Sequence, residues 1–141
     1  MKKLFFVALT IICSYATSFA QTKTPKAVET AFNAKFPKAT KVKWEKENAT
    51  EFEADFILNG AKRSANYSIS GEWLETESLT SFAKIPTKVQ DAFNTAHKGA
   101  KVKAVAVIEN ARGETLYEIE VKKGLKEVEY FYNADGTIHK K

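Results

Sequence analysis

The chain contains nearly the same stretch of sequence twice, and this repeat constrains the fold more than any other feature. The first copy, PKAVETAFNAKFP, covers residues 25–37, and the second, PTKVQDAFNTAHK, covers residues 86–98. Proline, valine, alanine, phenylalanine and asparagine recur 61 positions apart, as in the pair Phe32 and Phe93. A recurrence of this kind predicts two copies of one structural unit.

Each copy has the pattern of a short amphipathic helix. Proline at position 25 suits the first helical turn, and Pro37 disfavours helical geometry at the residue before it. Between them, apolar side chains recur at the i, i+3, i+4 and i+8 spacing of one helical face. They are Val28, Ala31, Phe32 and Phe36. Val89, Ala92 and Phe93 lie on the corresponding face and predict a second helix in residues 86–98.

After each helix the hydrophobic period changes from 3.6 residues to 2, which is typical of strands. Turn signals at Gly60 and Gly71 divide the first half, and Gly124 and Gly136 divide the second in the same way. The strands predicted in the first half lie near residues 40–48, 51–59, 61–69 and 72–80.

The predicted fold class is α+β, a tandem repeat of one helix plus a four-stranded antiparallel sheet. The first repeat covers residues 21–80 and the second covers residues 81–141. A unit of roughly 55 residues buries too little apolar surface to be robust alone, so we expect the two to pack as one two-layer module. The pattern leaves open whether the two sheets form one continuous surface.

Residues 1–20 have the order of a secretory signal peptide. Two lysines precede a short apolar run, and Ser18 and Ala20 have the spacing of the small residues before a cleavage site. The apolar run is too short to span a bilayer, which needs about 20 residues. A lipoprotein signal ending at Cys13 is an alternative, although isoleucines precede that cysteine where a small residue is expected. We expect a periplasmic or secreted protein with no transmembrane segment in the mature chain.

Cleavage after residue 20 removes the only cysteine, so the mature chain can form no disulfide. It also removes two of the 22 basic residues, which leaves 20 against 17 acidic residues. The charges are interleaved, and only two of the basic residues are arginines. This composition predicts a solvated surface and disfavours nucleic acid as a partner.

The sequence contains no catalytic signature. The mature chain has no cysteine, and the only histidines, His97 and His139, have no nucleophile in a recognisable motif beside them. Neither histidine belongs to a close group of metal ligands. We therefore expect no enzymatic activity, no metal and no cofactor.

Two groups of carboxylates share strand faces. Glu51, Glu53 and Asp55 alternate along one predicted strand, and Glu118 and Glu120 alternate along another. Paired carboxylates are able to act as general acid and base. We favour the simpler interpretation that they keep the outer face of the sheet solvated.

Aromatic residues are numerous on the predicted strands, and most are expected in the core. The segment EYFYN, however, places aromatics on both faces of its strand. Exposed aromatics on a sheet are good anchors for a protein partner. The predicted protein-binding residues are Trp44, Trp73, Tyr130 and Phe131.

Several of these stretches also resemble a known family. They are PKAVETAFNAKFPKATKVKWEKE, FEADFILNG, SGEWLETE, IPTKVQDAF and YEIEVKKG followed by NADG. They are similar to the PepSY-like, beta-lactamase-inhibitor-like exported proteins of Bacteroidetes-type bacteria, over nearly all of the mature chain. The resemblance implies a helix plus a four-stranded antiparallel sheet in tandem, and a non-enzymatic binding or inhibitory domain. It carries over no inhibitory site.

We therefore expect an exported protein-binding module, for example a modulator or inhibitor of a periplasmic or secreted hydrolase. Its partner would be an unidentified periplasmic or extracellular protein. The alternative is an envelope-associated binder of a small ligand, glycan or peptide, with a cleft between the two sheets as its site.

Overall fold

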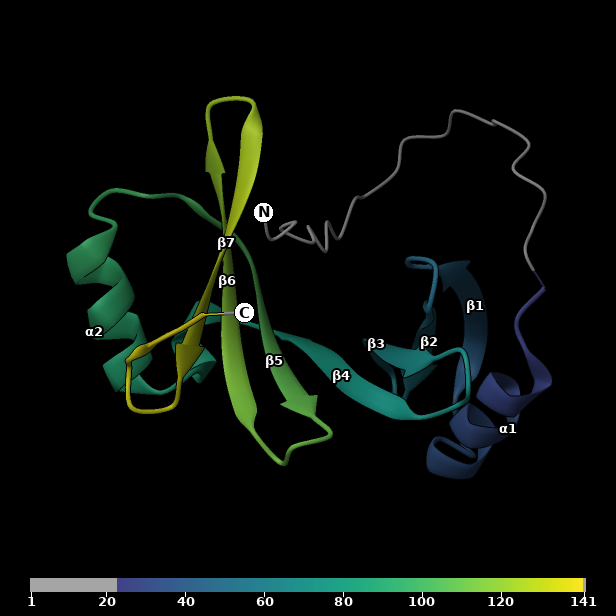
Figure 1. The fold of residues 1–141 in the computed structure, drawn as a ribbon. Helices are drawn as coiled ribbons and strands as arrows, with labels where there is room; N and C mark the ends of the chain where they lie inside the picture. Colours follow the sequence, from purple (N-terminus) through teal and green to yellow (C-terminus); the bar gives the residue numbers. More distant parts are fainter. Residues whose placement is uncertain (1–22, 141) are drawn as a thin grey trace.

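The computed structural model describes residues 23–140, which form two helices and one antiparallel sheet of eight strands (Figure 1). The strands lie in the sheet in the order in which they occur in the sequence. The elements are α1 (Lys26–Lys35), β1 (Thr40–Lys46), β2 (Glu51–Leu58), β3 (Ala61–Ser68), β4 (Trp73–Thr80), a 3-10 turn η1 (Phe82–Lys84), α2 (Thr87–Ala96), β5 (Val102–Asn110), β6 (Thr115–Lys123), β7 (Lys126–Asn133) and β8 (Ile138–His139).

The predicted α+β class is confirmed, but the two predicted four-stranded sheets are one continuous sheet. Strands β4 and β5 pair from Glu75 opposite Asn110 to Thr80 opposite Val105. The backbone edges that would end two separate sheets therefore bond to each other. The predicted signal peptide, residues 1–20, lies outside the described residues. No helix among residues 23–140 is long and apolar enough to cross a membrane.

Both helices begin and end in the same way. Pro25 and Pro86 precede them with nearly equal backbone angles, φ −59° and ψ 141° in the first and φ −54° and ψ 139° in the second. At the end of each helix, a backbone N–H donates a hydrogen bond to the carbonyl oxygen four residues earlier. The pairs are Phe36 to Phe32 in α1 and His97 to Phe93 in α2. The repeated stretch of sequence thus forms two helices of ten residues each.

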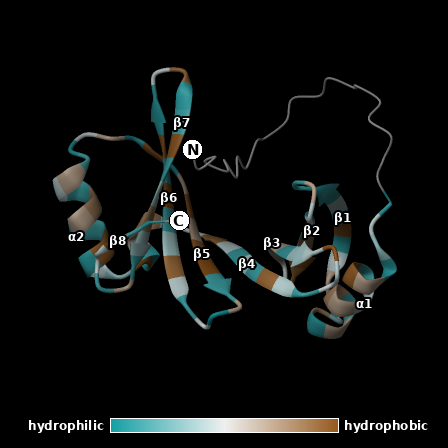
Figure 2. Ribbon diagram, viewed as in Figure 1, coloured by the Kyte–Doolittle hydropathy of each residue, from teal (hydrophilic) through white to brown (hydrophobic). Residues whose placement is uncertain are grey.

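Each helix packs its apolar face on its own half of the sheet. The cluster under α1 consists of Val28, Phe32, Phe36, Phe52, Ala54, Phe56, Ala65 and Tyr67. The cluster under α2 consists of Ile85, Val89, Phe93, Val105, Ile119, Val121 and Tyr132. Figure 2 shows hydrophobic and hydrophilic residues alternating along the central strands, as expected when one face of a sheet is buried.

Strand register places both helices on the same face of the sheet. Ala54 pairs with Ala65, and Ala65 pairs with Thr76. On the same face of β4, Thr80 pairs with Val105, which belongs to the cluster under α2. Because alternate residues of a strand share a face, both clusters lie on one side, which we call the helix face. The opposite side, which neither helix covers, is the open face.

A glycine turn approaches each helix closely. A Cβ placed on Gly71, in the turn before β4, would lie 2.8 Å from the carbonyl oxygen of Ala27. A Cβ placed on Gly136, in the turn before β8, would lie 2.6 Å from the carbonyl oxygen of Lys88. Only glycine permits these contacts between turn and helix, so these two turns fix each helix against the sheet.

Candidate functional site

Carboxylates from several strands meet on the open face. Glu53 lies on β2, Glu77 on β4, and Glu118 and Glu120 on β6. The open face continues across the junction between β4 and β5. Glu77 pairs with Ile108 and Ile108 pairs with Leu116, and paired residues lie on the same face of a sheet. The open face thus joins acidic residues that are more than 40 positions apart in the sequence.

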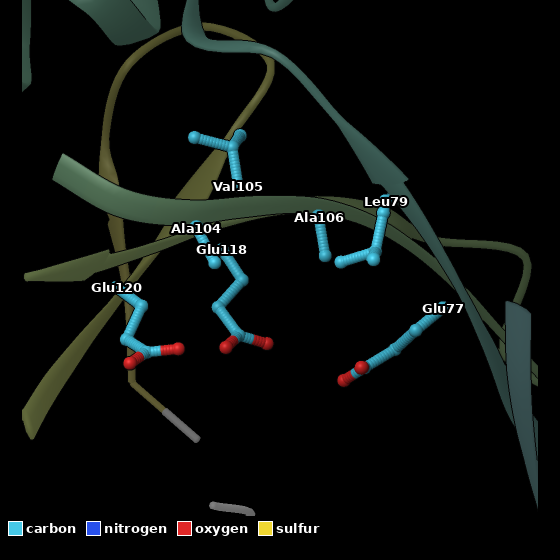
Figure 3. A pocket seen from close by; sticks show the side chains of 7 residues that line it. All are labelled: Glu77, Leu79, Ala104, Val105, Ala106, Glu118 and Glu120. Carbon is cyan, nitrogen blue, oxygen red and sulfur yellow. The ribbon is translucent and has the colours of Figure 1, made fainter. Parts of the chain in front are cut away.

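Three of these carboxylates line one shallow hollow beside β5, which we call the acidic hollow (Figure 3). Its lining consists of Glu77, Leu79, Ala104, Val105, Ala106, Glu118 and Glu120. In Figure 3 the side chains of Glu77, Glu118 and Glu120 extend to the same side of the sheet, whereas Val105 points to the opposite side. The hollow therefore combines three carboxylates with small and aliphatic side chains.

The carboxylates of the hollow are largely withdrawn from solvent. Glu77 is 9% exposed, Glu118 8% and Glu120 3%. The prediction that Glu118 and Glu120 keep an outer face solvated is therefore wrong. The reason is that β6 is an interior strand, and side chains of β5 and β7 flank both glutamates, including Phe131 opposite Glu118 and Glu129 opposite Glu120.

A lysine lies at one end of the hollow. The Lys103 Nζ is 3.0 Å from Glu120 Oε1, and it also donates a hydrogen bond to Glu127. The contact with Glu120 is an ion pair by distance, although Glu120 Oε1 forms no hydrogen bond of good geometry with any described residue. The hydrogen bond to Glu127 and then the close contact with Glu120 raise the pKa of Lys103, and the same lysine lowers the pKa of Glu127. This end of the hollow is thus partly neutralised.

The first half extends the acidic character of the open face. Burial raises the pKa of Glu53 from 4.5 to about 7, and the charge of Asp55 adds to the rise. Ser64 opposes this rise, although its Oγ forms no hydrogen bond of good geometry. Ser64 is buried and lies opposite Asp55 on one neighbouring strand and opposite Glu77 on the other. It therefore lies between the carboxylates of β2 and those of the hollow.

Two of the predicted binding residues belong to the first cluster on the helix face. Trp44 packs edge-on against Phe32, with ring centroids 5.2 Å apart. Trp73 is partly buried, donates its Nε1–H to Thr76 Oγ1 at 2.9 Å, and has the Lys35 Nζ 3.6 Å from its ring centroid. Both tryptophans therefore already have partners within the first half.

The other two predicted binding residues lie on opposite faces of β7. Tyr130 belongs to the helix face, where its ring centroid is 3.8 Å from that of His97 and its hydroxyl accepts a hydrogen bond from Lys123 Nζ at 2.6 Å. Phe131 belongs to the open face as the neighbour of Glu118. The four predicted residues thus share no common surface, and Phe131 is the one beside the acidic hollow.

The two histidines lie apart from the hollow. His97 ends α2, and burial and the charge of Lys123 lower its pKa. His139 lies on β8, with its Nδ1 3.3 Å from Asn133 Oδ1. Among residues 23–140, no group of three or more histidine, cysteine, aspartate or glutamate side chains is arranged to hold a metal ion.

The contribution of Glu77 to the site is not predictable from the alternation of one strand. The alternation along β6 paired Glu118 with Glu120, but Glu77 lies in the other half and reaches them only because β4 pairs with β5. The alternation along β4 puts Glu75 and Glu77 on the open face. It indicates that Glu77 belongs to the hollow only when the pairing of β4 with β5 is known.

Comparisons with known proteins agree on the fold. A family model described as "Putative beta-lactamase-inhibitor-like, PepSY-like" matches residues 11–61 and 51–140. No curated protein matches the sequence.

Solved structures from Bacteroides are similar over most of the chain. A Bacteroides eggerthii protein described as "putative periplasmic" has a TM-score of 0.75 and 19% identity, covering 84% of this chain and 87% of that one. A DUF2874 family protein of Bacteroides ovatus has a TM-score of 0.73 and 23% identity, covering 84% and 86%. A BLIP-like protein of Bacteroides fragilis has a TM-score of 0.69 and 24% identity, covering 84% of each chain. At these identities the similarity shows the fold alone.

Proposed function

Because this chain belongs to the PepSY-like, beta-lactamase-inhibitor-like family, we propose that it is an exported binding protein whose open face receives a basic segment of a partner protein. The proposed location is the periplasm or the extracellular space. The predicted signal peptide supports this location, as does the description of the Bacteroides eggerthii relative. Modulation or inhibition of a hydrolase is the activity that we propose for such binding.

The acidic hollow is the observation that carries this proposal. Its carboxylates at Glu77, Glu118 and Glu120, the last of them next to Lys103, form an acidic cluster that attracts a cationic group. Leu79, which is 48% exposed, and the small Ala104 and Ala106 offer apolar contact next to them. Lysine and arginine side chains combine an aliphatic stem with a charged end, so they match both parts of this lining.

Binding accounts for the hollow better than catalysis does. The lining includes no serine, threonine, cysteine or histidine, so the carboxylates have no side-chain nucleophile beside them among the lining residues. A buried ion pair across an interface gives orientation and selectivity to a protein contact. The position of the carboxylates supports the proposal that they select a basic partner.

We also propose that the two halves are copies of one unit. Tyr67 and Tyr132, 65 positions apart, are both buried, and neither hydroxyl has a hydrogen-bond partner among residues 23–140. Gly71 and Gly136, also 65 positions apart, both lie against the first turns of their helices. The same two features at the same offset support a duplication of one unit. Joining the two copies through β4 and β5 would then make one wide open face.

The test uses peptides of opposite charge and matched apolar content. The exported protein is titrated by calorimetry with an alternating lysine–leucine peptide and with an alternating glutamate–leucine peptide. We expect the lysine peptide to bind and the glutamate peptide not to bind. The double variant Glu118→Gln/Glu120→Gln should weaken that binding by about tenfold or more, since a hydrogen bond to a charged group contributes about 1.5–3 kcal/mol.

The matched control is Glu109→Gln, which removes an exposed carboxylate from the helix face of β5. This variant should bind the lysine peptide as the unmodified protein does. Thermal unfolding of each variant verifies that the fold is kept. Equal binding of the two peptides, or an unchanged affinity in the double variant, would exclude the acidic hollow as the site. Binding of neutral glycans in place of peptides would favour the envelope-ligand alternative.

A further inference from the structure

The hairpin between β6 and β7 extends beyond the strands on either side of it (Figure 1). β6 and β7 stay paired as far as Lys123 and Lys126, whereas the pairing of β5 with β6 begins with Val102 opposite Val121. On the other side, β8 pairs only with the last part of β7. The end of the hairpin, residues 122–127, is therefore a two-stranded projection that pairs with no further strand of the described part of the chain.

The tip of this projection is apolar and is surrounded by positive charge. Leu125 is fully exposed, more so than any other large apolar side chain among the described residues. Lys122, Lys123 and Lys126 are also exposed. The one carboxylate of the projection, Glu127, already receives a hydrogen bond from Lys103. We call residues 122–126 the basic tip.

The equivalent hairpin of the first half has a different character. At the tip between β2 and β3, Asn59 and Ala61 flank Gly60. In the basic tip, Lys123 and Leu125 flank the turn glycine. The fold therefore does not require a lysine and a leucine at this turn, and both residues add surface that the turn itself does not use.

We infer that the basic tip is a membrane-surface contact that inserts Leu125 into the interface of an anionic lipid bilayer. An apolar side chain on a narrow projection is able to enter the boundary between headgroups and acyl chains. Lysines beside it extend their stems along the apolar region and keep their ammonium groups at the phosphates. Lys122 and Lys126 beside Leu125 match this layered environment, whereas Lys123 already donates a hydrogen bond to the Tyr130 hydroxyl.

A bilayer fits the basic tip better than a folded protein does. Specific protein interfaces bury about 800 Å² on each partner, and a two-residue turn with one apolar side chain offers no flat surface of that size. A fluid bilayer instead closes around a projection of any shape. Because the tip lies at the end of the strands, a bilayer contacted end-on leaves the acidic hollow on the open face accessible. The inference is independent of the proposed function.

Vesicle co-sedimentation of the exported protein tests this assignment. The probes are phosphatidylcholine vesicles that contain phosphatidylglycerol and vesicles of phosphatidylcholine alone. We expect binding to the anionic vesicles, a loss of binding at high salt, and little binding to the neutral vesicles. Leu125→Ser should reduce the partition coefficient by about tenfold, and Lys122→Ser/Lys126→Ser should reduce it by about 25-fold, at about fivefold for each lysine.

Two variants serve as matched controls. Lys62→Ser removes the lysine at the equivalent position after the turn of the first hairpin, and Ile69→Ser removes an exposed apolar side chain from another turn. Both should bind anionic vesicles as the unmodified protein does. No binding to anionic vesicles, or equal loss in the controls and the tip variants, would overturn the inference. Self-association in solution that Glu118→Gln abolishes would also overturn it, because the tip would then dock in the acidic hollow of a second copy.

Discussion

The carboxylate of Glu53 makes the stability of the protein depend on pH in a direction opposite to that of most carboxylates. Its pKa is about 7 in the folded protein and about 4.5 in an unfolded chain, because burial and the charge of Asp55 disfavour the ionised form. The folded state therefore binds more protons than the unfolded state between these two values. The free energy of unfolding falls as pH rises through this range and levels off above the folded pKa.

The magnitude follows from the same pKa. A rise from 4.5 to about 7 gives an upper bound of about 3 kcal/mol, since one pH unit corresponds to about 1.4 kcal/mol. Glu53 is only partly buried, so solvent screening reduces this to about 1–2 kcal/mol. Glu53→Gln removes the titration, and we expect this variant to gain about 1–2 kcal/mol over the unmodified protein between pH 5 and pH 8.

Urea unfolding of both proteins at several pH values measures the difference. The difference between the curves is the relevant quantity, because His97 has a lowered pKa and gives the opposite slope below its ordinary value of 6.5 in both proteins. The lowered pKa values of Glu114, Glu127 and Asp135 give such a slope only below the ordinary range of a carboxylate. Glu109→Gln, an exposed carboxylate on the other face, serves as the control and should keep the slope of the unmodified protein. A Glu53→Gln curve parallel to that of the unmodified protein would refute the reasoning.

Three further predictions concern the turns, the second core and the junction between the halves. Gly71→Ala should lower the free energy of unfolding by about 2–4 kcal/mol because the new Cβ meets a helix carbonyl at positive φ, whereas Gly60→Ala, at positive φ in open space, should lower it by about 1 kcal/mol in the same denaturation assay. Phe93→Ala, in the second core, should cost about 3–5 kcal/mol. Tryptophan fluorescence reports on the first half alone, because Trp44 and Trp73 both lie there, whereas far-UV circular dichroism reports on the whole sheet. We expect the joined sheet of the Phe93→Ala variant to unfold as one unit, so both signals should shift to the same lower midpoint. Separate midpoints would show that the halves unfold independently.

The sequence alone was sufficient to locate most elements. The helices predicted within residues 25–37 and 86–98 are Lys26–Lys35 and Thr87–Ala96 in the structure. The predicted strands near residues 51–59 and 61–69 are Glu51–Leu58 and Ala61–Ser68. These elements depend on hydrophobic period, prolines and turn glycines, which are properties of neighbouring residues, so they are readable without a partner segment.

The candidate site was only half predictable. Alternation along β6 places Glu118 and Glu120 on one face, and the same reasoning applies to Glu53 and Asp55 on β2. Alternation does not determine burial, because solvent access depends on which strands and side chains flank the residue. The expectation of a solvated face was therefore wrong for the two glutamates of β6, which lie inside an eight-stranded sheet.

Sequence by itself determined the α+β class, the positions of the two helices and most strands, and the separation of polar from apolar residues along each strand. Only the tertiary structure decided that β4 pairs with β5, and with it that Glu77 joins the two glutamates of β6 in one hollow. The physical reason is that the edges of every strand offer the same backbone donors and acceptors. Which two edges meet is decided by the packing of both helices and the whole sheet, and no short stretch of sequence contains that information.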